Sequence, residues 1–312
     1  MSRAATGAAP GKVILFGEHA VVYGRPAVAA SLATGLGATV TPFPGGPELE
    51  VPGWDLHVRL DQKGSRFDAI ARGFATALDA AGVQDRALKV TVDGELPPGV
   101  GLGSSAAFAV AVLRALGEWN HAPLTGEPLL AAAHAVEAVF HGTPSGLDHT
   151  VIATGGCLRF ERGAQTTFTP VPLARPVPAV VAWAPRKGST RQAVAGLRVR
   201  HEALPAHFDR VFDAIGAVTE AGLQALASGD FDRLGQLFDL NHGLLNACGV
   251  SNVDNERMVA VAREAGAAGA KLTGAGLGGA VVAVTPLGAD RVVEALQRAG
   301  YKAFQTRLGT GR

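Results

Sequence analysis

The sequence predicts a protein of mixed helices and strands, in the α+β class. Short apolar runs bounded by turn residues, such as Val13–Phe16, are typical of buried strands. Longer stretches with apolar residues at helical spacing, such as Phe67–Ala81 with Ile70, Phe74 and Leu78, predict helices. In the second half the predicted elements follow in the order strand, turn, strand, helix, helix, strand. This order favours an α+β arrangement of the split βαβ kind.

Composition limits the classes of partner. A chain of 312 residues is long enough for two packed units or one large one. The net charge of +1 and the lack of a tract rich in Lys and Arg argue against nucleic acid. No apolar run reaches membrane-spanning length, so we expect a cytoplasmic protein with no membrane partner. Cys157 and Cys248 cannot form a disulfide framework or a zinc site alone, and we expect both to be small buried residues.

The first half of the chain is predicted to contain both strands and helices. Residues 1–9 are small and polar, so we expect disorder at the start. The strand Val13–Phe16 is followed by strands with turns over Ala30–Leu60 and by the helix Phe67–Ala81. The other elements predicted in this half are the strand Leu88–Val92, the helices Ser104–Trp119 and Glu127–Phe140, and the strand Cys157–Phe160.

Helical patterns dominate the second half. A glycine-rich loop, Lys271–Gly279, joins two strands within Ala270–Val284. The other elements predicted here are the strand Val177–Trp183, the helices His201–Leu226, Phe231–Leu245, Glu256–Ala265 and Asp290–Ala299, and the strand Ala303–Thr306.

A second glycine loop leads directly into a helix and indicates a phosphate site. Gly99, Gly101 and Gly103 can take positive φ and let the backbone approach a ligand, while Ser104 or Ser105 caps the helix. The helix start presents free N–H groups and the positive end of the helix dipole. A tight turn before a core helix is the simpler alternative. The predicted phosphate cradle consists of Pro97, Pro98, Gly99, Val100, Gly101, Leu102, Gly103, Ser104, Ser105, Ala106 and Ala107.

Two common nucleotide motifs are excluded. A P-loop has a Lys directly after its last Gly, and here Ser104 follows Gly103. The pattern G-x-G-x-x-G occurs at Gly274, Gly276 and Gly279, but a strand-like run follows it, whereas the dinucleotide motif opens a helix.

Several polar residues stand at the ends of apolar elements. Lys12 precedes a buried strand, and Glu18 and His19 follow it. A solvated lysine and a core histidine are the simpler interpretations of Lys12 and His19 taken singly. Glu137 lies among apolar residues of its helix, which favours a buried or ligand-facing role. Asp148 begins an ordered element after an irregular loop, where an acidic residue at a helix start is the simpler interpretation.

Three stretches together carry a family resemblance. In this order and spacing, Pro10–Ala29, Pro97–Ala106 and Lys271–Gly279 resemble the three motifs of the GHMP kinase superfamily. Within it, Gly17–Gly24 and His141–Asp148 resemble the mevalonate kinase family, and the resemblance covers nearly the whole chain.

The resemblance implies a two-domain GHMP kinase fold with its active site in the cleft between the domains. We expect an N-terminal domain at 1–165, with the ATP loop and catalytic residues, and a C-terminal domain at 166–312, whose glycine loop closes the site. The implied reaction moves the γ-phosphoryl group of ATP to the primary hydroxyl of mevalonate, giving 5-phosphomevalonate for isoprenoid synthesis. ATP and Mg²⁺ are the implied cofactors, and a homodimer is a candidate assembly.

The resemblance also implies roles for single residues. Asp148 matches the catalytic aspartate, Lys12 the lysine that pairs with it, and Ser105 and Glu137 the pair that binds Mg²⁺ with the ATP phosphates. The chemistry fits, because a carboxylate can accept the proton of an alcohol and a fixed positive charge can stabilise the developing alkoxide. The residues implied to bind substrate are Lys12, Glu18, His19, Ser145, Asp148, Arg162, Gly274, Ala275 and Gly276.

Three alternatives remain open at this point. Phosphomevalonate kinase is a sister enzyme that would need extra basic residues for the substrate phosphate. A diphosphomevalonate-decarboxylase-like lyase shares the fold, but the intact Gly17–Gly24 stretch argues against it. A non-catalytic ligand sensor would not need Lys12, Ser105, Glu137 and Asp148 together.

Overall fold

The computed structural model describes residues 4–60, 68–163, 166–184 and 190–310. The chain forms two compact units that are interleaved along the sequence. The first contains Met1–Lys12, Thr34–Pro98 and Leu102–Thr154, and the second contains Val13–Ala33, Gly99–Gly101 and Gly155–Arg312. A single division after residue 165 does not coincide with these units, and it stays a prediction.

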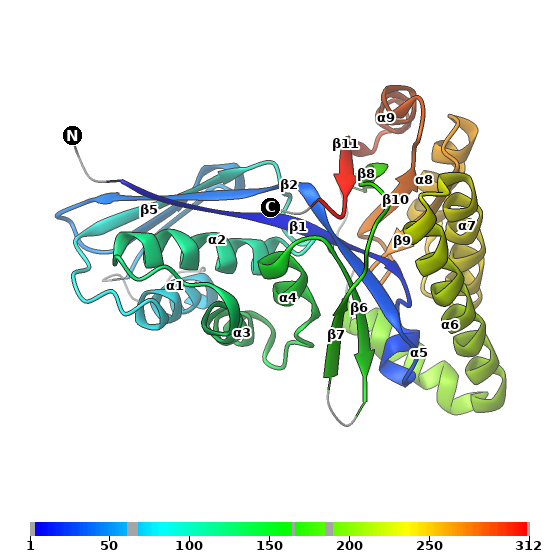
Figure 1. The fold of residues 1–312 in the computed structure, drawn as a ribbon, viewed down its shortest axis with the longest axis horizontal. Helices are drawn as coiled ribbons and strands as arrows, with labels where there is room; N and C mark the ends of the chain where they lie inside the picture. The colour runs from blue at the N-terminus through cyan, green and yellow to red at the C-terminus, as the bar shows by residue number, and fades with distance from the viewer. Residues whose placement is uncertain (1–3, 61–67, 164–165, 185–189, 311–312) are drawn as a thin grey trace. The chain divides into compact units, whose positions relative to one another are not determined.

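Two long strands, β1 (Ala5–Phe16) and β2 (Ala27–Pro42), each run from one unit into the other (Figure 1). A glycine in β2 lets the backbones of the two strands lie very close. A Cβ on Gly35 of β2 would lie 2.1 Å from the carbonyl oxygen of Ala9 in β1. Residues 5–9 are therefore part of a paired strand, and the predicted disorder is wrong for them. Residues 1–3 lie outside the described part of the chain.

The first unit packs helices against a small sheet. In the sheet, β3 pairs with β4 antiparallel and with β5 parallel, and β5 pairs antiparallel with β2. The helix α2 contacts α1, α3 and α4 as well as β5, and it is buried over most of its surface because it is apolar except at a few positions such as Arg114 and Glu118. The elements are β3 (Glu48–Val51), the short 3₁₀ helix η2 (Pro52–Trp54), β4 (Leu56–Arg59), α1 (Asp68–Ala80), β5 (Leu88–Gly94), α2 (Ser104–Trp119), α3 (Gly126–His141) and α4 (Leu147–Thr154).

The second unit contains the remaining strands and helices. β8 lies between β10 and β11, β9 pairs with β10, and β6 pairs with β2 and β7, all antiparallel. α6 and α7 pack side by side (Figure 1). The elements are η1 (Ala20–Tyr23), β6 (Cys157–Arg162), β7 (Thr166–Pro170), β8 (Val177–Trp183), α5 (Thr190–Ala203), α6 (Pro205–Ser228), α7 (Phe231–Ala247), α8 (Val253–Glu264), β9 (Gly269–Thr273), β10 (Ala280–Val284), α9 (Ala289–Arg298) and β11 (Lys302–Leu308).

Close packing of α7 on β9 fixes the strand that leads into the second glycine loop. A Cβ on Gly269 of β9 would lie 1.9 Å from the carbonyl oxygen of Gly235 in α7, so only glycine fits. The buried side chains of Phe212, Ile215 and Leu245 extend this core to Leu272. The strand β9 is buried along its whole length, which gives the loop after it a rigid base.

The α+β class is confirmed, with differences in particular elements. The helix predicted from His201 begins at Pro205, because residues up to Ala203 complete α5 and Pro is tolerated in the first turn of a new helix. Gly103, not Ser104 or Ser105, occupies the N-cap position of α2. The start predicted at Phe67 lies outside the described residues. In the described part of the chain, none of the helices is long and apolar enough to cross a membrane.

Candidate active site

A lysine and an aspartate from distant parts of the sequence form an ion pair in the first unit. Lys12 Nζ lies 3.0 Å from Asp148 Oδ1, with the lysine side chain 5% exposed and the aspartate 38% exposed. Lys12 is fixed by β1, where its backbone N–H donates to Leu102 O at 2.9 Å. Asp148 stands in the first turn of α4. A buried ammonium thus faces a carboxylate that a ligand can still reach.

Gly103 allows this lysine to pass the start of α2. A Cβ at Gly103 would lie 2.8 Å from Ile152 Cδ1 and 2.9 Å from Lys12 Cγ, and its φ is +74°. Both the space and the backbone conformation therefore require glycine at this position. The third glycine of the predicted cradle therefore makes room for Lys12 as well as shaping the loop.

Glu137 is a buried carboxyl group in α3. It is 2% exposed, and its Oε1 has no hydrogen-bond partner among the described residues. Burial, and then the charge of Asp148, raise the pKa of Glu137 to about 7, against the opposing effects of the Ser105 hydrogen bond and of Lys12. The Glu137 carboxyl is therefore harder to ionise than an ordinary glutamate, and a bound cation would favour its ionised form.

Ser105 and Glu137 come together because α2 packs on α3. The Ser105 hydroxyl is 3.1 Å from His141 Nε2, and Glu137 Oε2 is 3.9 Å from the same nitrogen. The Ser105 hydroxyl and the Glu137 carboxylate, one oxygen of which has no partner among the described residues, form a donor set of the kind that Mg²⁺ uses in proteins. Sequence reasoning missed His141, although its spacing of four residues from Glu137 on one helix places the two side by side.

In the second unit the turn after β1 carries Glu18 and His19. The Glu18 carboxylate is completely buried and accepts hydrogen bonds from Lys271 Nζ and from Asn241 Nδ2, the latter at 3.1 Å. His19 has φ +63° and donates from Nε2 to Ala275 O at 2.9 Å. Burial lowers the pKa of His19, against the raising effect of that backbone contact. Burial therefore favours the neutral imidazole, and its proton is on Nε2 because the Ala275 carbonyl can only accept.

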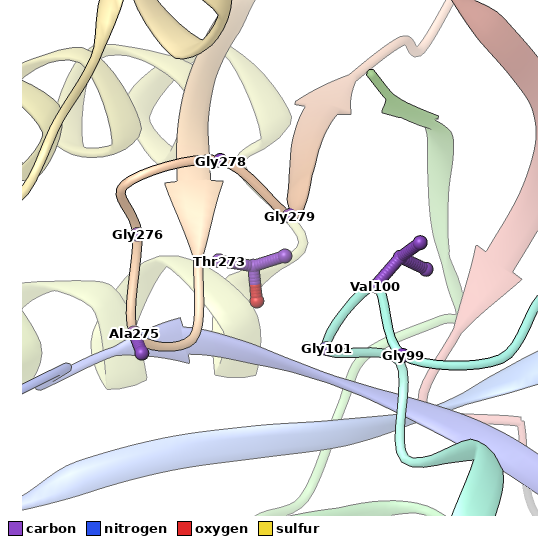
Figure 2. Close-up of a pocket in the computed structure, with 8 residues that line it drawn as sticks. All are labelled: Gly99, Val100, Gly101, Thr273, Ala275, Gly276, Gly278 and Gly279. Atoms are coloured by element: carbon purple, nitrogen blue, oxygen red, sulfur yellow. The ribbon is translucent and has the colours of Figure 1, made fainter. Parts of the chain in front are cut away.

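The two glycine loops face each other across a small pocket in the second unit (Figure 2). Gly99, Val100 and Gly101 form one wall, with φ of +74° at Gly99 and +90° at Gly101, as the sequence predicts. The opposite wall consists of Thr273, Ala275, Gly276, Gly278 and Gly279. These walls are backbone and small side chains, so N–H groups can approach a ligand closely.

The loop between β9 and β10 is held from outside the pocket. Asn255 Nδ2 donates to Gly278 O at 3.1 Å, and Asn255 Oδ1 accepts from Gly278 N at 3.0 Å. Leu277 N donates to Val250 O at 2.7 Å, and a Cβ on Gly276 would lie 2.0 Å from that oxygen. Sequence reasoning missed Asn255, because a contact across 23 positions leaves no local pattern.

The remaining predicted residues have simpler surroundings. Ser145 is exposed in the loop before α4, where its hydroxyl accepts from Leu147 N at 3.3 Å. Arg162 is exposed at the end of β6, opposite Thr166 in the hairpin with β7. Gly274 belongs to the loop between β9 and β10 and takes φ +80°. The substrate roles of these residues stay predictions.

Comparison with known proteins gives consistent matches. The model described as GHMP kinases N terminal domain matches residues 69–156, and GHMP kinases C terminal matches residues 223–302. The chain is 36% identical to mevalonate kinase of Thermococcus gammatolerans, over 96% of this chain and 95% of the relative. It is also 36% identical to mevalonate kinase of Methanothermobacter thermautotrophicus, over 95% of each chain. A crystal structure of L. major mevalonate kinase in complex with R-mevalonate aligns with a TM-score of 0.84 at 33% identity, covering 99% of this chain and 98% of that one.

Proposed function

Because the chain belongs to the GHMP kinase family, and within it to the mevalonate kinases, we propose that it transfers the γ-phosphoryl group of ATP to the primary hydroxyl of mevalonate. The observation that carries the mechanism is the ion pair of Lys12 and Asp148. The product is 5-phosphomevalonate, and the second product is ADP. This reaction belongs to the mevalonate route of isoprenoid synthesis.

The ion pair acts on the alcohol. The mevalonate oxygen attacks the γ-phosphorus, the bond from that phosphorus to the β,γ-bridging oxygen breaks, and the hydroxyl proton passes to Asp148. Because phosphoryl transfer has a loose transition state, proton acceptance contributes modestly and positioning contributes more. Lys12, which is almost fully buried, supplies a fixed positive charge close to the developing negative charge on the alcohol oxygen.

The other predicted groups serve the nucleotide. Ser105 and Glu137 would hold Mg²⁺, which supplies positive charge to the phosphate oxygens of ATP. The support for this is the unpartnered buried oxygen of Glu137 and the nearby hydroxyl. Gly99 and Gly101 offer the backbone conformation of a phosphate cradle. Homodimerisation and a cytoplasmic location also belong to this proposal.

Phosphomevalonate kinase is the less supported alternative, since the relatives compared above are mevalonate kinases. A coupled assay of ADP release with mevalonate, phosphomevalonate, galactose and homoserine as acceptors tests the substrate. We expect turnover with mevalonate far above that with the other three. Preferred turnover of phosphomevalonate would contradict the proposal.

Substitution of the ion pair tests the mechanism. Asp148→Asn keeps the shape of the side chain but removes the proton acceptor, so we expect kcat to fall by ~10²-fold or more, with ATP binding little changed. Lys12→Met is expected to lower kcat by a similar factor. The double variant should lower kcat by far less than the product of the two single factors, because the two residues act as a unit. Asp79→Asn is the matched control, since it removes an exposed carboxylate paired with Arg86 on the same unit. Near-normal activity of Asp148→Asn, or fully additive losses, would refute the mechanism.

A further inference from the structure

The sequence resemblance implies that Glu18 binds substrate, but its carboxylate is fully engaged inside the protein. Its side chain is completely buried, Oε1 is paired with Lys271, and Oε2 accepts from Asn241 at 3.1 Å. A substrate hydroxyl or carboxylate would have to displace a buried ammonium to reach it. Both oxygens of the Glu18 carboxylate are therefore engaged in contacts within the protein.

Lys271 is enclosed and has acceptors on several sides. Besides Glu18, its Nζ donates to Leu272 O at 2.7 Å and reaches Ile14 O at 3.5 Å, and it lies 5.6 Å from the centre of the Phe238 ring. A fully buried ammonium is unfavourable unless it is paired and hydrogen-bonded. The arrangement meets both conditions, and all of its partners lie in the second unit.

The pair ties down a turn whose backbone is strained. Glu18 stands between Gly17, with φ +86°, and His19, with φ +63°. Gly17 cannot be replaced, since a Cβ there would lie 2.3 Å from Pro26 O. A histidine with positive φ persists only where its surroundings hold the backbone in that conformation. The anchored Glu18 side chain is such a constraint on the residue next to it.

Three alternate residues of β9 and the loop after it contact the segment from Ile14 to His19. Lys271 binds Glu18, the Thr273 hydroxyl accepts from Ile14 N at 2.9 Å and donates to Ile14 O at 3.0 Å, and Ala275 O accepts from His19 at 2.9 Å. Lys271 and Thr273 are two apart in the extended strand β9, so they share the face that contacts Glu18 and Ile14. The turn after Thr273, where Gly274 takes φ +80°, brings Ala275 O to the His19 ring.

We propose that Lys271 and Asn241 are positioning residues, which hold Glu18 so that the turn keeps the His19 imidazole against the loop between β9 and β10. Glu18 then acts through His19 and does not itself contact mevalonate. The inference rests on the proposed function for the placement of His19 at the substrate. The hold on His19 itself is independent of which substrate binds.

A double-mutant design tests this inference. Lys271→Met, Glu18→Gln/Lys271→Met and Asn241→Ala are made in the wild-type chain and in His19→Ala, and KM for mevalonate, kcat and melting temperature are measured. In the wild-type background we expect KM to rise about tenfold for the lysine variants and less for Asn241→Ala, within the usual range for coupled contacts. In the His19→Ala background the same changes should alter KM by less than about twofold, since their route through His19 is gone.

Leu296→Ala is the control for loss of stability alone, because Leu296 is buried in a different core cluster of the same unit. It should lower the melting temperature without raising KM. Equal KM effects in both backgrounds, or lower melting temperatures with unchanged KM, overturn the inference. If Lys271→Met does not fold, the double variant and Asn241→Ala decide it, because neither leaves a buried carboxylate without its cation.

A spectroscopic measurement separates this inference from the proposed function. The ¹⁵N signals of the His19 ring are identified by their loss in His19→Ala. We expect them to shift in Asn241→Ala and in the double variant, and to stay in place in Leu296→Ala. If the wild-type protein does not phosphorylate mevalonate but the His19 signals shift in these two variants, only the proposed function is refuted. If the signals do not shift in the variants, the positioning role is refuted.

Discussion

Replacing Glu137 by glutamine should stabilise the metal-free protein relative to the wild type by an amount that grows as the pH rises. The Glu137 carboxyl has a pKa of about 7 in the folded protein, against 4.5 for the ordinary group. A group whose pKa is raised by folding contributes stability below its unfolded pKa and loses that contribution as pH rises through its folded pKa. Here the loss falls between pH 4.5 and pH 8. At about 1.4 kcal/mol per pH unit, the wild-type chain loses ~2–3 kcal/mol from pH 5 to pH 8 through this one group.

Glu137→Gln removes the titrating group and keeps its size. The difference in unfolding free energy, variant minus wild type, should therefore grow by the same ~2–3 kcal/mol from pH 5 to pH 8. Urea unfolding at both pH values, without Mg²⁺ or nucleotide, measures it. Glu127→Gln is the matched control, an exposed glutamate in the first turn of the same helix, and should give no such growth. A difference that is the same at both pH values would refute the reasoning.

Three further outcomes can be measured. Glu137→Gln should also raise the Mg²⁺ concentration needed for half-maximal activity, and a Mg²⁺ titration that overlays the wild type would remove Glu137 from the metal site. In Gly103→Ala the new methyl group must displace Lys12 or Ile152 while the backbone keeps a positive φ. We therefore expect ~1–3 kcal/mol lower stability and a reduced kcat. An unchanged kcat would show that Lys12 tolerates this displacement. Asn255→Leu leaves the buried N–H and C=O of Gly278 without their partners, so the melting temperature and ATP affinity should both fall, as thermal unfolding and calorimetry would show. Unchanged ATP affinity would mean that the loop keeps its shape without Asn255.

Local pattern was sufficient where local interactions decide the structure. The bounds predicted for α2, Ser104–Trp119, are those of the structure, because a run of alanine and other apolar residues follows three glycines. Positive φ at Gly99 and Gly101 followed from the same alternation. The start of α6 was missed, since the helical pattern runs on through α5 and only Pro205 marks the break.

The contacts within the candidate site needed more than local pattern. Lys12 and Asp148 were paired in advance only through the family resemblance, and taken singly each had a simpler interpretation. Lys271 was part of a recognised motif, but nothing in its neighbours predicts that its ammonium is buried against Glu18. Such pairings depend on which segments meet in the folded chain, and a single sequence does not record them.

The interleaving of the two units has a consequence for synthesis on the ribosome. The first unit is complete once Thr154 has left the exit tunnel, whereas Val13–Ala33 must wait for partners that come later. Within that segment, Ala27–Ala30 pair with Cys157–Phe160, and Leu32 pairs with Leu308. Apolar residues such as Phe16 and Leu32, which are buried in the finished fold, therefore lack part of their packing until the later segments of the second unit have been made. Neither unit can be produced by cutting the gene at one point, because each consists of separate segments of the chain.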